Sequence, residues 1–149
     1  MTLLKKDEET VLLKISCDEI RFIHQALIVP LYAFHTPDFE EKVGFSEVEV
    51  KVIEERLSKI LADRPDYDEY HKLALKLDNE AKASNYFVDL NLSLKELVLI
   101  NNAFRESCDV IVKRDEIHTL TGHTIEEAQA LEKQLQAIVK EVEHEFKRN

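Results

Sequence analysis

Apolar residues recur along this chain at two spacings, and the same succession of spacings occurs twice. Residues 11–15 and 87–92 carry apolar side chains at alternate positions, which predicts a short strand in each segment, although an extended or helical lead into the next helix fits equally well. In residues 17–29, 47–62, 94–110 and 125–146, apolar residues stand three and four apart, which predicts four amphipathic helices. A fifth helix is expected over residues 66–83.

The two halves of this pattern superpose at an almost constant shift. At a shift of 77 residues the first helices of the two halves superpose, with Ile20, Ile23 and Leu27 falling on Leu97, Ile100 and Phe104. At a shift of 78 residues the apolar stripe of 47–62 falls on that of 125–146. The agreement predicts a mainly α fold built as a tandem duplication of a two-helix unit. One domain would span residues 1–149, with repeats at about 11–62 and 88–146 joined by a linking helix at about 66–83. The two strands can pair as one short two-stranded antiparallel ribbon.

Four capping motifs mark the starts of the four repeat helices. In each, a serine or threonine is followed three residues later by a glutamate, so that hydroxyl and carboxylate can satisfy amide donors of the first turn. The pairs are Ser16 with Glu19, Ser46 with Glu49, Ser93 with Glu96, and Thr124 with Glu127. Gly44 and Gly122 each stand two residues before the second cap of a repeat, where we expect the backbone to need a positive φ.

Composition adds limits on partners and location. Twenty basic and thirty acidic side chains give a net charge of −10, which repels nucleic acid and anionic lipid and attracts basic proteins, although solubility alone also explains such a charge. The two cysteines form no CxxC pair, which suits a reducing compartment. Residues 1–9 contain no long apolar stretch, so we expect neither a signal peptide nor a membrane span, and a cytoplasmic location.

No catalytic or metal-binding motif emerges from the residues. His118 and His123 bracket a glycine turn instead of sharing a helix face, and the chain has no Gly-rich phosphate loop and no GxSxG elbow. Cys17 and Cys108 have acidic neighbours, which disfavour a reactive thiolate, so both are expected to be packed and inert. The sequence therefore predicts no enzymatic activity, no cofactor and no metal.

Acidic side chains concentrate in corresponding parts of the two halves. Seven acids stand against two lysines between residues 38 and 55, and six against two lysines between residues 126 and 145. Charge of one sign steers an oppositely charged partner, whereas a solvated helix surface is the plainer alternative. The candidate partner-binding residues are Asp38, Glu40, Glu41, Glu47, Glu54, Asp66 and Asp68.

The second unit, residues 92–104 followed by 122–128, resembles a unit of the small acidic immunity proteins encoded beside bacterial polymorphic or contact-dependent toxins. The resemblance implies a protein without catalysis that neutralises a cognate toxin by stoichiometric binding, often over the toxin's active site. The first half departs from the unit at residues 24 and 25 and at Pro30, which leaves open whether one half binds or both. The alternative is a homodimeric structural or regulatory module that pairs through Val139, Val142 and Phe146.

Overall fold

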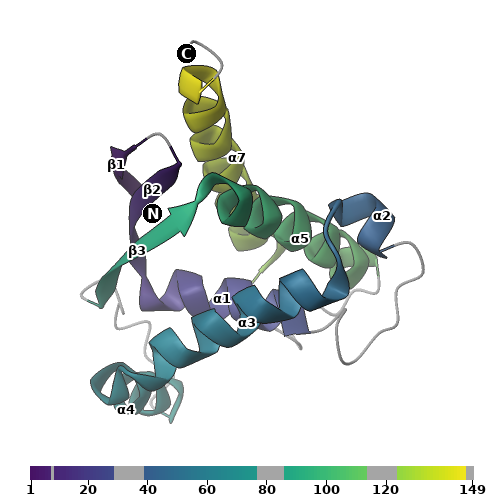
Figure 1. Ribbon diagram of the computed structural model, residues 1–149. Coiled ribbons are helices and arrows are strands. Elements are labelled where there is room, and N and C mark those ends of the chain that lie inside the picture. Colours follow the sequence, from purple (N-terminus) through teal and green to yellow (C-terminus); the bar gives the residue numbers. More distant parts are fainter. Residues whose placement is uncertain (8, 29–38, 77–85, 114–123, 147–149) are drawn as a thin grey trace.

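The computed structural model describes residues 1–7, 9–28, 39–76, 86–113 and 124–146, and these form three strands and six helices (Figure 1). In chain order they are β1 (Thr2–Lys6), β2 (Thr10–Ser16), α1 (Cys17–Ile28), α2 (Phe39–Val43), α3 (Glu47–Ala62), α4 (Pro65–Lys76), β3 (Phe87–Ser93), α5 (Leu94–Lys113) and α7 (Ile125–Phe146). The fold is therefore mostly helical, and a three-stranded antiparallel sheet makes it a mixed fold instead of a purely helical one.

The sheet has the order β1-β2-β3, and both pairings are antiparallel. β2 and β3 form the expected ribbon in an unbroken register from Thr10 opposite Ser93 to Ser16 opposite Phe87. β1 was not predicted, because residues 2–6 contain only two apolar side chains and no alternation. Its pairing with β2 creates the strand, with a register shift between Leu3 and Lys5.

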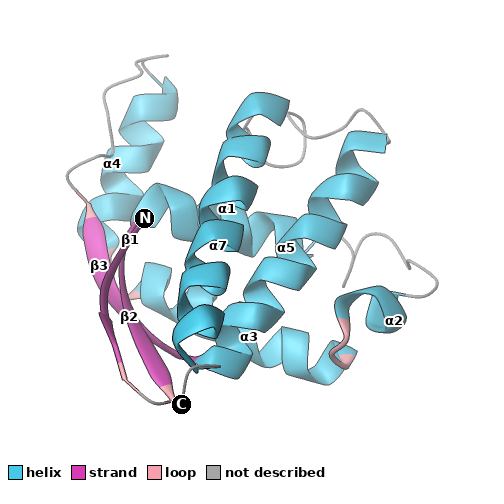
Figure 2. Ribbon diagram, turned by 90° about the horizontal axis from the view of Figure 1, so that it is seen from above, coloured by secondary structure: helices cyan, strands magenta, loops and turns pink. Residues whose placement is uncertain are grey.

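The helices cover one face of the sheet, and the core lies between them (Figure 2). Along β2 and β3 the buried side chains alternate, as the sequence pattern predicted. α1 packs against α3, α5 packs against α7, and α1 and α5 pack against each other. At this last contact the rings of Phe22 and Phe104 meet edge to face, with their centroids 5.3 Å apart. Burial of these stripes is the main favourable contribution to folding.

Most apolar positions that the sequence shift brings together are buried alike. The exceptions include Val88 and Ile60, which are partly buried, whereas their counterparts Val11 and Ile138 are buried. On the first helices, all six superposed positions are at most 2% exposed: Ile20, Ile23, Leu27, Leu97, Ile100 and Phe104. On the second helices, the six positions Val50, Ile53, Leu57, Ala128, Leu131 and Leu135 are at most 4% exposed. In the sheet, Leu13 pairs directly with Leu90, its counterpart at a shift of 77 residues.

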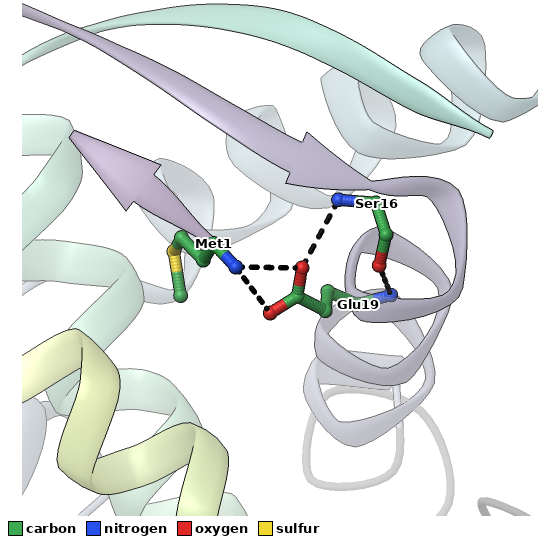
Figure 3. A network of polar contacts seen from close by, with 3 residues as sticks. All are labelled: Met1, Ser16 and Glu19. Atoms are coloured by element: carbon green, nitrogen blue, oxygen red, sulfur yellow. Dashed lines mark hydrogen bonds and ion pairs between the residues drawn. The ribbon is translucent and has the colours of Figure 1, made fainter. Parts of the chain in front are cut away.

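All four predicted capping motifs form. In each, the serine or threonine amide donates to the glutamate carboxylate and the glutamate amide donates to the hydroxyl oxygen, at 2.9 to 3.3 Å. At the first cap, the Glu19 carboxylate also accepts hydrogen bonds from the α-ammonium group of Met1, at 3.1 Å to each oxygen (Figure 3). The capping boxes predicted from sequence are thus confirmed.

Expectations about the connections have different outcomes. Gly44 has the positive φ that was expected, +83°, whereas Gly122 lies outside the described residues. Between α1 and α3, residues 39–43 form the short helix α2. The linking helix is present as α4 over Pro65–Lys76, and the remaining residues predicted for it lie outside the described part.

Candidate binding surface

The predicted contact residues do not form one surface. Glu40 and Glu41 are exposed on α2, and Glu47 begins α3 beside them. The amide of Glu47 donates to Glu40 Oε1 at 2.9 Å, so one of these carboxylates also caps the helix that follows. We call Glu40, Glu41 and Glu47 the acidic corner. Asp38, the remaining candidate in this stretch, lies outside the described residues.

Asp66 and Asp68 lie at the opposite end of α3, in the first turn of α4. A helix of 16 residues is about 24 Å long, and both views show α2 and α4 on opposite sides of the molecule (Figures 1 and 2). Both aspartates form ion pairs, Asp66 with Arg64 at 3.3 Å and Asp68 with Lys72 at 3.0 Å. The hydrogen bond from Arg64 lowers the pKa of Asp66. A partner bound at the acidic corner would therefore have to extend along the whole of α3 to contact Asp66 or Asp68.

The prediction that Glu54 contacts a partner has to be corrected, because its side chain faces the core instead of solvent. Only 8% of the residue is exposed, and its Oε1 lies 2.8 Å from Nε2 of His24 on α1. Glu54 follows Val50 by four residues and so falls on the buried side of α3. This carboxylate joins two helices and is not available to a partner.

Two more carboxylates of this region are held by basic side chains across the α3–α5 contact. Glu49 of α3 pairs with Lys95 of α5 at 2.8 Å, and Glu96 of α5 pairs with Arg56 of α3 at 2.7 Å. Hydrogen bonds from Lys95 and from the Ser46 amide lower the pKa of Glu49. The Glu49–Lys95 pair reduces the negative charge that the sequence alone predicts for residues 38–55.

Two arginine side chains, Arg56 and Arg64, reach the outer edge of the sheet. Arg56 donates to the backbone carbonyl oxygen of Asn91, and Arg64 donates to that of Phe87 at 3.3 Å. Both acceptors belong to β3, which is paired with β2 along its other side. Side chains from the α3 region therefore occupy hydrogen-bonding positions on the free edge of this strand.

Sequence reasoning missed an exposed apolar pair on α3. Val48 and Val52 are 70% and 59% exposed and lie one helical turn apart, on the side of α3 opposite the buried Val50, Ile53 and Leu57. The signal was present in the sequence, because both valines fall off the apolar stripe of this helix. They lie in the first half of α3, which begins at the acidic corner.

The ionisable groups in the interior are held in structural contacts. Cys17 is fully buried beside Tyr67, whose hydroxyl donates to Asp18, and burial raises the pKa of both the thiol and the phenol. Cys108 is 4% exposed, and burial together with the nearby Glu132 raises its pKa to about 12. The expectation that both thiols are packed is confirmed.

Two of the three positions expected to form a homodimer surface on the last helix are not exposed, and the Phe146 side chain lies outside the described part. Val139 and Val142 are 7% and 0% exposed, and they belong to the core in which α7 packs against α5. The apolar stripe that suggested pairing between two chains is therefore used within one chain, at least at these two positions.

Searches of the described residues and comparisons with known proteins add only negative findings. In the described ranges, no three histidine, cysteine or acidic side chains gather in a way that could hold a metal ion. Over the same ranges, none of the helices has the length and apolar character needed to span a bilayer. Comparisons with protein-family models, curated proteins and solved structures found no match.

Proposed function

We propose that this chain is a non-catalytic binding protein of the immunity type, which neutralises a basic partner protein in the cytoplasm by stoichiometric binding. The observation that carries the proposal is the acidic corner, where Glu40, Glu41 and Glu47 gather on a chain of net charge −10. Negative charge of this kind raises the rate of encounter with a positive surface and selects against acidic partners.

The way in which other ionisable groups are used supports a binding role over a catalytic one. The Glu54 carboxylate is paired with His24 and the Asp18 carboxylate with Tyr67, and both thiols are buried with raised pKa values. A nucleophile or general base has to reach a substrate, whereas Glu54 and both thiols are buried and the partly buried Asp18 accepts from Tyr67. Their positions suit a rigid scaffold that presents a surface.

We also propose that the fold is a tandem duplication of a strand–helix–helix unit. The similar burial of most superposed apolar positions, the four capping boxes and the pairing of Leu13 with Leu90 support it. An antiparallel pair in which equivalent residues lie opposite each other is what a local twofold axis through that pair would produce. β1 adds a strand to the first unit, and the corresponding positions of the second unit, 79–83, lie outside the described residues.

The function can be tested by isolating the partner and reconstituting the complex. The tagged protein is used to recover a companion from lysate of its own cells at low salt, and the companion is then expressed with and without it. We expect one basic companion in equimolar amount that arrests growth when expressed alone and is tolerated when co-expressed. A companion whose effect on growth persists at equimolar co-expression would refute neutralisation.

Charge reversal then distinguishes the two groups of predicted acids. We expect Glu41→Lys to weaken the reconstituted complex and to make its affinity less dependent on salt, because an exposed carboxylate of the acidic corner is lost. Asp68→Lys makes the same change of charge on α4 and serves as the matched control. Equal effects of the two substitutions would show that net charge, and not the acidic corner, drives binding.

A further inference from the structure

We draw no further inference here: the strongest candidate, the face of the three-stranded sheet that the helices leave open around Leu12 and Phe87, carries the oppositely charged Lys14 and Asp89 side by side, and nothing in the described part of the structure shows what covers it.

Discussion

The same substitution at two neighbouring positions of α3 should have very different consequences for stability. Val50 is fully buried and Val52 is 59% exposed, so replacing each in turn by alanine removes the same two methyl groups from the core in one case and from the surface in the other. The comparison holds helix, residue type and chemical change constant. It tests directly whether the exposed valine contributes to the fold.

The magnitudes follow from burial. At Val50, loss of two buried methyl groups costs about 1.6 kcal/mol, with roughly 1 kcal/mol more for the cavity that remains. Alanine returns about 0.5 kcal/mol through its better helix propensity, so the net loss is about 2 kcal/mol. At Val52, the gain in propensity offsets the small loss of contact, and the change should lie within about 0.5 kcal/mol of zero.

Urea unfolding followed by circular dichroism measures both free energies, and thermal unfolding gives a second measure. For a domain of this size, a difference of about 2 kcal/mol corresponds to a separation of roughly 4 to 8 °C between the two midpoints. Equal free energies of unfolding for the two variants would refute the assignment of Val50 to the core and of Val52 to the surface.

Three further predictions concern caps, the buried pair and pH. Ser93→Ala should lower the free energy of unfolding by about 1 kcal/mol in urea titrations, because it removes the hydroxyl that accepts from the Glu96 amide; an unchanged value would contradict the cap. Glu54→Ala should cost about 1 to 3 kcal/mol in the same titrations, since His24 is left partly buried without its partner. The parent should lose stability as pH rises from 9 to about 12, because the Cys108 thiol ionises at its ordinary pKa of 9.0 when unfolded and only near 12 when folded. Cys108→Ala should show a smaller loss over this range in thermal unfolding at each pH, and an identical profile would exclude the thiol.

Most of the helical framework could be predicted because its signals are local. The start of α7 follows from Thr124 and Glu127, three residues apart, and its buried positions follow from a period that a helix imposes. β1 could not be predicted in this way, because the pairing with β2 and not its own sequence makes residues 2–6 a strand. The sheet therefore has three strands where local pattern indicated two.

The candidate site was only partly predictable, for a related reason. Counting acids between residues 38 and 55 treats every carboxylate as free, whereas Glu49 is paired with Lys95, a residue distant in sequence. Such partners are chosen by the packing of α3 against α5, which a linear count does not contain. The burial of Glu54 is different, because its position four residues after Val50 already placed it on the buried side of the helix.

The arginines that reach β3 also bear on how the protein behaves at high concentration. An open strand edge is a template on which further chains can add, and the carbonyl groups of Phe87 and Asn91 are occupied by Arg64 and Arg56. At the other edge, β1 carries an irregular register and the charged Lys5 and Lys6, two features that discourage growth of a sheet. Both margins of the described sheet therefore carry features that discourage the addition of strands from other copies of the chain.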